Sequence, residues 1–169
     1  MSRKALLITG INGFVGRGLA AALQGSDRLL KGTEKGGRRR ETGDGRRKNG
    51  SQIFVTGEID KLTDWSEALN GIDVVVHLAA RVHVMDDLAD DPLAEFRKVN
   101  TTGTLNPARQ AAVASVKRFI FISSIKVNGE GTTLNHPFSP DDTFVPDDPY
   151  GVSKYEAEQG LLAIAEETG

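Results

Sequence analysis

Short apolar runs alternate with segments of helical periodicity along the chain. Residues 5–8 form a run of apolar side chains, which is typical of a strand buried on both faces of a parallel sheet. Glycines follow at once. Residues 15–23 then carry apolar side chains at helical spacing until Gly25, a residue type that favours the end of a helix. The first unit is therefore predicted to be a strand, a glycine turn and a helix.

Four further apolar runs predict the remaining strands. The run at residues 29–30 is weak, the run at 53–55 is clearer, the run at 73–78 gives the strongest strand pattern, and 116–123 gives the last. Because strands that alternate with helices are joined in parallel, we predict an α/β fold with a doubly wound parallel sheet of the Rossmann type and about five strands. Ligands are then expected at the carboxyl ends of the strands.

Three more helices are expected between and after these strands. A short one begins at the capping sequence of residues 64–67. A long helix over residues 91–114 has Pro92 in its first turn, and Pro107 is expected to kink or interrupt it because proline lacks a backbone donor. The final helix is expected over residues 153–167.

Residues 36–50 stand apart from this alternation. They contain five glycines and six basic residues without a single apolar side chain. Since nothing in this segment can be buried in a core, we predict a flexible, solvated basic loop. A polyanion-binding patch is the weaker interpretation, because no aromatic side chains are interleaved for base stacking.

Composition and charge indicate a soluble globular protein with one domain over residues 1–169. The chain is 38% hydrophobic and 26% charged, and its net charge of −2 creates no global field that would attract nucleic acid. It has no cysteine and no apolar run of membrane-spanning length. We therefore expect a cytoplasmic protein with neither a nucleic acid nor a membrane as its partner. The three histidines lack metal-ligand spacing, so no metal site is expected.

The glycine turn, TGINGFVG at residues 9–16, is the first candidate for ligand chemistry. Gly10 permits a tight turn, Gly13 lets backbone N–H groups approach a pyrophosphate, and Gly16 permits close packing of the helix. The helix N-terminus adds a favourable partial charge. On this motif alone, a glycine-rich turn without a ligand remains the alternative.

Glu34 is the second candidate. It lies 18 residues beyond Gly16, close to the interval at which an acidic residue binds the adenosine ribose hydroxyls. This position favours NAD as the cofactor. NADP remains possible, because Lys35 and the arginines at 38–40 could receive a ribose 2′-phosphate, and a solvated glutamate is the third interpretation.

Tyr150 and Lys154 are four residues apart, so a helix places them on the same face. A nearby ammonium stabilises a phenolate and lets a tyrosine act as a base near neutral pH. Ser124 follows the last predicted strand, where its hydroxyl would face the same crevice. The alternatives are a chance Tyr–Lys pairing and a strand-end serine that bonds only to backbone.

Three motifs occur in the order and spacing of one family: TGINGFVG at residues 9–16, SSIKVNG at 123–129 and YGVSK at 150–154. Together they resemble an extended short-chain dehydrogenase/reductase of the NAD-dependent epimerase/dehydratase group. Shorter matches support the resemblance over nearly the whole chain. They are GEI at 57–59, HLAA at 77–80 and VNTTGT at 99–104.

The resemblance implies a role for each candidate. Tyr150 would be the base, Lys154 would tune its pKa and bind the ribose, and Ser124 would polarise the reacting hydroxyl. Tyr150 would take the proton from a sugar C4 hydroxyl while hydride passes to NAD, and the keto sugar would be reduced again from its other face. Besides Tyr150 and Lys154, the residues implied to contact the cofactor are Gly10, Gly13, Phe14, Val15, Gly16, Glu34, Glu58, Ile59, Leu78, Ala79, Ala80 and Asn100.

Within the group, residues 77–83 and the pair Ile125 and Lys126 look most like bacterial UDP-hexose or UDP-N-acetylhexosamine 4-epimerases of surface-polysaccharide pathways. The implied substrate is therefore a UDP-sugar. A nucleotide-sugar 4,6-dehydratase or a 4-keto reductase is the alternative. A dehydratase usually has acidic residues directly after its catalytic serine, and Ile125 and Lys126 argue against it.

The family's chains continue past the Tyr–Lys helix into further strands and a smaller C-terminal substrate domain, which we expect to be absent here. The chain would then be the cofactor-binding portion of an epimerase, or a non-catalytic dinucleotide-binding fragment. Because the family's dimers pack through the long central helix and the Tyr–Lys helix, a homodimer is expected. Asn128, where the family often has tyrosine, and the long basic segment after Glu34 depart from the pattern.

Overall fold

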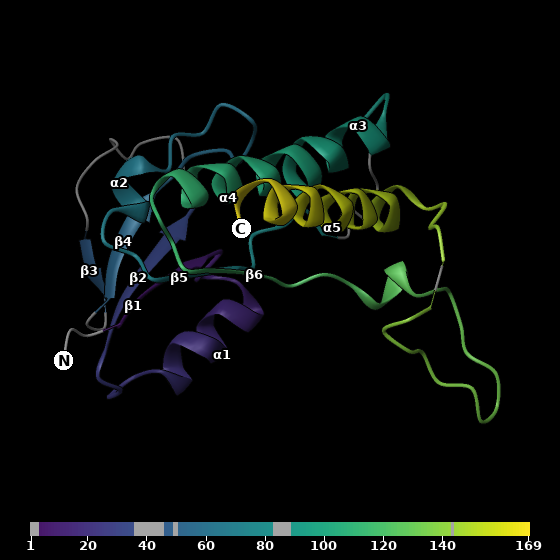
Figure 1. Ribbon diagram of the computed structural model, residues 1–169, viewed down its shortest axis with the longest axis horizontal. Coiled ribbons are helices and arrows are strands. Elements are labelled where there is room, and N and C mark those ends of the chain that lie inside the picture. Colours follow the sequence, from purple (N-terminus) through teal and green to yellow (C-terminus); the bar gives the residue numbers. More distant parts are fainter. Residues whose placement is uncertain (1–3, 36–45, 49–50, 83–88, 143) are drawn as a thin grey trace.

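A six-stranded sheet forms the centre of the molecule, with strands in the order β3-β4-β2-β1-β5-β6 (Figure 1). The computed structural model describes residues 4–35, 46–48, 51–82, 89–142 and 144–169. Five strands are parallel, as predicted, and β3 alone is antiparallel, paired with β4. In chain order the strands are β1 (Lys4–Thr9), β2 (Arg28–Glu34), β3 (Arg46–Lys48), β4 (Ser51–Val55), β5 (Val74–His77) and β6 (Arg118–Phe121).

Strand β3 corrects the prediction of a loop over residues 36–50. Its backbone pairs with β4 in a register that sets Arg46 opposite Ile53 and Lys48 opposite Ser51. An edge strand is held by backbone N–H and C=O groups and does not require buried side chains, so the lack of apolar residues did not exclude it. The rest of the predicted loop, residues 36–45 and 49–50, lies outside the described residues.

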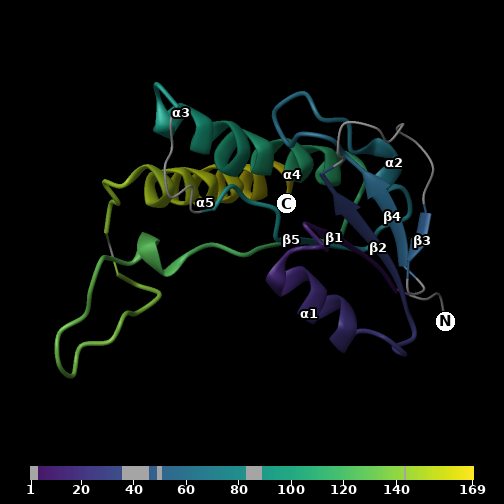
Figure 2. The same cartoon turned by 180° about the vertical axis from the view of Figure 1, so that it is seen from behind.

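The helices cover both faces of the sheet, which confirms the doubly wound arrangement. Helix α1 lies on one face, and the other described helices lie on the opposite face, as the two views in Figures 1 and 2 show. The helices are α1 (Phe14–Ala22), α2 (Ser66–Leu69), α3 (Pro92–Phe96), α4 (Gly103–Val113) and α5 (Pro149–Thr168), with a π-helical segment η1 (Arg97–Thr102) and a short 3-10 segment η2 (Ile125–Val127).

The long central helix is irregular, but not where the sequence predicted. Pro107 lies within the continuous helix α4, and the departure from α geometry is the segment η1 upstream of it. Thr102 adds a side-chain hydrogen bond to this segment, because its hydroxyl donates to the Lys98 carbonyl at 2.9 Å. The prediction of an interruption at Pro107 is therefore wrong, and the alternative of a kink there stays a prediction. A π segment inside an α-helix often marks a functional site.

Helix α5 begins four residues earlier than predicted. Pro149 occupies its first turn, and the Asp148 side chain accepts a hydrogen bond from the Gly151 N–H at 3.0 Å. Asp before Pro is a common N-terminal signal, because the carboxylate caps the helix and proline needs no partner there. Tyr150 therefore lies in the first turn of α5, which supports the predicted helical relation to Lys154.

Apolar clusters lie on both faces of the sheet. Leu7 and Val75 pack with the fully buried Trp65 on the face covered by α2 and α4. Ile8 and Val76 pack against α1 on the opposite face. Because neighbouring positions of a strand point to opposite faces, a continuous apolar run fills both clusters. This burial fixes the strand ends, where the candidate site lies.

Candidate functional site

The turn between β1 and α1 depends on its glycines. Gly10 has a φ of +66°, and a Cβ there would lie 3.0 Å from the backbone of Ala79 at the end of β5. A Cβ at Gly16 would lie 2.4 Å from the carbonyl oxygen of Gly10, closer than any ordinary contact. Gly10 therefore provides the turn and Gly16 the close helix packing that the sequence predicted for them.

The N-terminus of α1 is open to a ligand. Its cap residue, Gly13, has no side chain that could cap the helix, and its carbonyl accepts the Arg17 N–H at 2.9 Å. The first-turn N–H groups of a helix have no acceptor within the helix. Phe14 and Val15 are 90% and 55% exposed, so this end faces outward. Such an end binds anionic groups such as a pyrophosphate, since backbone donors and the helix dipole act together.

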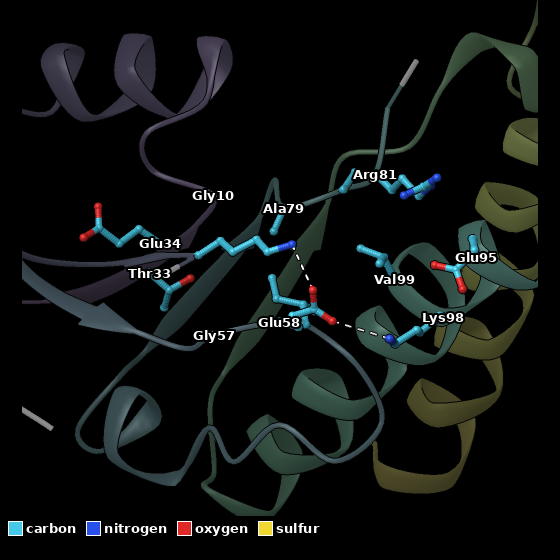
Figure 3. A pocket seen from close by; sticks show the side chains of 13 residues that line it. Gly10, Thr33, Glu34, Gly57, Glu58, Ala79, Arg81, Glu95, Lys98 and Val99 are labelled. Carbon is cyan, nitrogen blue, oxygen red and sulfur yellow. Dashed lines mark hydrogen bonds and ion pairs between the residues drawn. The ribbon is translucent and has the colours of Figure 1, made fainter. Parts of the chain in front are cut away.

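A cavity of about 340 Å³ lies beside this turn, at the carboxyl edge of the sheet (Figure 3). It is bounded by the ends of β1 and β2, the segments that follow β4 and β5, and the central helix. The predicted cofactor residues Gly10, Glu34, Glu58, Ile59, Ala79 and Ala80 line it. Thr33, Arg81, Glu95 and Lys98 also line it and were not among the predicted site residues.

Glu34 and Glu58 occupy different parts of this cavity, and their carboxylates point away from each other (Figure 3). Asn12 donates its side-chain amide to Glu34. Glu58 is bound on both sides by ammonium groups, from Lys35 at 3.2 Å and from Lys98 at 3.4 Å. The hydrogen bond and charge of Lys35, and then those of Lys98, lower the pKa of Glu58 below its usual value. Glu58 is therefore a carboxylate at neutral pH.

His77 ends β5 beneath the site and is a structural residue. Its ring nitrogens lie 2.9 Å from the Thr9 hydroxyl and 3.1 Å from the Thr104 hydroxyl, and the side chain is 1% exposed. The Thr9 hydroxyl also accepts the N–H groups of Leu78 and Ala79, both at 3.1 Å. The neutral ring thus ties β1, β5 and the central helix together at the edge where the cavity opens.

His77 gives the protein an acid-sensitive stability. Burial first, and then the charge of Lys154, lowers the pKa of His77 from 6.5 to about 3. The unfolded chain takes up the proton at the higher pH, so the stability from His77 is complete above about pH 6.5 and is lost as the pH falls towards 3. The loss amounts to about 1.4 kcal/mol per pH unit in that window.

Urea unfolding of the wild type and of His77→Gln between pH 7 and pH 4.5 tests this prediction. In this window Asp73, whose pKa is lowered by the hydrogen bond from Lys117, stays ionised in both proteins and adds little to either slope. The wild type should lose stability more steeply, because it alone has His77. Equal slopes for the two proteins would contradict the assignment.

Lys154 lies at the end of β6 in a buried position. Its ammonium donates to the Ile122 carbonyl at 2.8 Å and lies 3.9 Å from the centre of the Phe121 ring. The side chain is 3% exposed, and this burial lowers the pKa of Lys154 to about 8. The ammonium is therefore held at the carboxyl end of β6, where the chain leaves the sheet and continues into Ser123 and Ser124.

Tyr150 lies about one turn before Lys154 in α5. Ser124 precedes η2 and lies two residues after Ile122, whose carbonyl accepts the Lys154 ammonium. The Tyr150 ring packs edge-on against Phe96, with the ring centres 5.9 Å apart. Ser124 caps η2 and accepts the Lys126 N–H at 3.4 Å, and the Lys126 ammonium lies 3.4 Å from Asp148 at the start of α5. Across the described residues, no hydrogen bond joins Ser124, Tyr150 and Lys154 directly to one another. Their catalytic roles stay predictions.

Asn100 is fully buried in η1 and binds protein groups. Its carbonyl oxygen accepts the Arg81 N–H at 2.8 Å, and its amide donates to the Arg81 carbonyl and the Ser153 hydroxyl, both at 3.0 Å. Ser153 in turn donates to the Tyr150 carbonyl at 2.7 Å. Asn100 thus joins the segment after β5 to the first turns of α5. Its predicted contact with the cofactor stays a prediction.

The family described as "NAD dependent epimerase/dehydratase family" matches residues 6–169. The chain belongs to this family. Among its curated relatives, a UDP-glucose 4-epimerase of Vibrio cholerae is 46% identical over 98% of this chain and 48% of its own length. The chain thus spans about half the length of the curated relatives that it matches over most of its residues.

Two solved structures of similar proteins superpose well on this epimerase/dehydratase family member. A short-chain dehydrogenase/reductase superfamily protein from Agrobacterium tumefaciens, with bound NAD, has a TM-score of 0.73 and 28% identity, over 98% of this chain and 46% of its own. MoeE5 in complex with UDP-glucose and NAD has a TM-score of 0.73 and 27% identity, over 95% and 49%. These similarities confirm the Rossmann-type fold and the family resemblance predicted from the motifs.

Neither a membrane-spanning helix nor a cluster of metal-binding side chains occurs among the described residues of this epimerase/dehydratase family member. Among the helices that the structure describes, none is both long and apolar enough to cross a membrane. In the same part of the chain, no three side chains of the metal-binding types gather at one place.

Proposed function

We propose that this chain binds NAD at the carboxyl edge of its sheet and is the cofactor-binding portion of an NAD-dependent UDP-hexose or UDP-N-acetylhexosamine 4-epimerase. The observation that carries the proposal is the uncapped N-terminus of α1, which follows the glycine turn and lies beside the cavity. The pyrophosphate would bind the N–H groups of the first turn at Phe14 and Val15. The adenosine would occupy the cavity beside Gly10, Glu34 and Glu58.

NAD is favoured over NADP by the charge at the end of β2. Glu34 lies on the cavity wall, where its carboxylate would accept hydrogen bonds from ribose hydroxyls and would repel a 2′-phosphate. Lys35 follows it, but its ammonium is bound by Glu58 at 3.2 Å. The predicted alternative of NADP binding through the arginines at 38–40 concerns residues outside the described ones.

We propose that oxidation and reduction of the sugar at C4 take place at the carboxyl end of β6. Bound NAD supplies a reversible hydride acceptor. Tyr150 would take the proton from the sugar C4 hydroxyl, Ser124 would hold that hydroxyl by a hydrogen bond, and the Lys154 ammonium would stabilise the phenolate. Burial of Lys154 supports this role, because a charge in a less polar environment acts more strongly on its neighbours. A UDP-sugar is the proposed substrate.

An epimerase is favoured over a dehydratase by the residues that follow Ser124. Ile125 is exposed, and the Lys126 ammonium is bound by Glu130 at 3.0 Å and by Asp148 at 3.4 Å. Elimination of water needs an acid and a base close to the substrate, and no carboxylic acid occupies these two positions. The rival from another class is a dinucleotide-binding fragment without catalytic activity.

Purification of the chain followed by absorbance and mass spectrometry tests cofactor binding, and we expect NAD to be retained or taken up. The NAD-loaded chain is then incubated with UDP-galactose and with UDP-N-acetylgalactosamine, and Tyr150→Phe serves as the inactive control. Interconversion with the gluco epimer that depends on Tyr150 supports the epimerase. A 4-keto-6-deoxy product would favour a dehydratase, and an NAD-loaded chain that forms no product would favour the non-catalytic fragment.

We also propose a cytoplasmic homodimer, with α4 and α5 at its interface. The two helices lie side by side on one face of the sheet in both views (Figures 1 and 2). This is the arrangement through which the resemblance implies that dimers pack. Gel filtration with light scattering should give twice the chain mass of 18.2 kDa. Elution at the mass of one chain would contradict the dimer.

A further inference from the structure

Glu58 is the centre of a charge cluster on the cavity wall. Its carboxylate binds two ammonium groups that come from distant parts of the sequence, Lys35 after β2 and Lys98 in η1, and Figure 3 marks both contacts with dashed lines. The Lys35, Glu58 and Lys98 side chains are 70%, 63% and 44% exposed. Ion pairs this exposed are weak, so Glu58 reduces the availability of each lysine to an anionic ligand by a modest factor.

Among the described residues that line the cavity, the charges balance while Glu58 is ionised. Three of these residues are acidic, Glu34, Glu58 and Glu95, and three are basic, Lys35, Arg81 and Lys98. The two lysines hold Glu58 in its charged form, as the lowered pKa of Glu58 indicates. Removal of that carboxylate would leave an excess of one positive charge and would release two ammonium groups into the cavity.

Lys35 is placed where this release would change the choice of cofactor. It directly follows Glu34, the residue expected at the adenosine ribose, and both side chains line the same cavity. NAD and NADP differ only in a phosphate on the ribose 2′-hydroxyl. We propose that Glu58 sets the preference for NAD by holding Lys35, and with it Lys98, away from the position of a 2′-phosphate. This inference rests on the proposed function and adds an indirect selectivity residue to it.

The test compares dissociation constants for NAD and NADP, measured by calorimetry on the purified chain and on Glu58→Gln. Glutamine keeps the size of the side chain and removes its charge. We expect the ratio of NADP affinity to NAD affinity to rise about tenfold in the variant, as two weak ion pairs allow. A contact between Glu58 and the adenine would be lost for both cofactors alike, so the ratio isolates the effect on the phosphate.

Two further variants separate release of the lysines from a general change in charge. Glu95→Gln removes one negative charge from the same cavity, and among the described residues no ion pair joins Glu95 to Lys35 or Lys98. We expect it to change the ratio much less than Glu58→Gln does. Lys35→Met in the Glu58→Gln background should reverse most of the gain in NADP affinity.

The outcomes distinguish this inference from the proposed function. A wild-type chain that binds neither NAD nor NADP would contradict the proposed function itself. A wild-type chain that binds NAD, with an unchanged affinity ratio in Glu58→Gln, would overturn the inference alone. An equal rise in Glu95→Gln would overturn it as well, because the cavity charge and not the hold on Lys35 would then set the preference.

Discussion

Gly16→Ala is expected to abolish measurable NAD binding by this chain and to lower its free energy of unfolding by about 1–3 kcal/mol. The added Cβ would lie 2.4 Å from the Gly10 carbonyl oxygen and 2.8 Å from the backbone of Ile11, neither of which can move without opening the turn. Displacement of α1 would carry its first-turn N–H groups away from the pyrophosphate. Calorimetry with NAD and urea unfolding would measure the two effects.

Gly18→Ala is the matched control, two residues further along α1. A Cβ at Gly18 would meet no atom within 4 Å, so it introduces no clash. Alanine is the better helix former, and we expect a gain in stability of about 0.5–1 kcal/mol with unchanged NAD affinity. Wild-type NAD affinity in Gly16→Ala, or an equal loss in both variants, would contradict the role assigned to the glycine turn.

Trp65→Ala is expected to be the most destabilising single substitution considered, at a cost of about 3–5 kcal/mol in the free energy of unfolding. Trp65 is 0% exposed and packs between α2 and the sheet, in the cluster that contains Leu7 and Val75. Truncation would leave a large cavity under the strands whose ends form the site. Urea unfolding followed by circular dichroism would measure the loss, together with the fraction folded without urea.

Trp65→Phe separates packing from hydrogen bonding at the same position. Within the described part of the chain, the buried indole nitrogen has no hydrogen-bond partner. Phenylalanine would therefore lose some volume and no hydrogen bond, and we expect less than half of the cost of alanine. An equal cost for the two variants would mean that the indole N–H, and not the packing of the ring, supports the fold.

The alternation of apolar runs and helical segments was enough to predict the class of fold, because each run reflects a purely local requirement. Residues 5–8 and 74–76 are apolar because they lie between two helical layers, and they belong to β1 and β5, two interior strands of the sheet. Strand β3 could not be predicted in this way. It is held by backbone pairing with β4, which requires no pattern of apolar residues in the sequence at positions 46–48.

The candidate site likewise contains residues that the local sequence predicts and residues whose place depends on tertiary packing. Gly10 and Gly16 are recognisable because only glycine fits where the backbone approaches itself or a neighbouring strand. Lys98 and Arg81 could not be found, since their place on the cavity wall depends on how η1 and the segment after β5 approach the sheet. The pairing of Lys35 and Lys98 through Glu58 likewise joins residues that no local pattern relates.

The family motifs predicted more of the site than periodicity did, yet they did not show how its residues are held. Asn100 was expected as a contact of the cofactor, and the structure gives its amide hydrogen bonds to Arg81 and Ser153. His77 belongs to a family motif and is a buried, neutral link between β1 and the central helix. The hydrogen bonds of both residues join segments that are far apart in the sequence, so a local motif does not predict them.

Binding of NAD at the uncapped N-terminus of α1 can be observed directly by amide NMR of the labelled chain. We expect NAD to shift the amide signals of residues 10–16 most, with smaller changes near Glu34 and Glu58. Signals from residues 115–117, which line the distant groove between α4, α5 and β6, should stay unchanged. Saturating NAD that leaves residues 10–16 unaffected would contradict binding at this helix end.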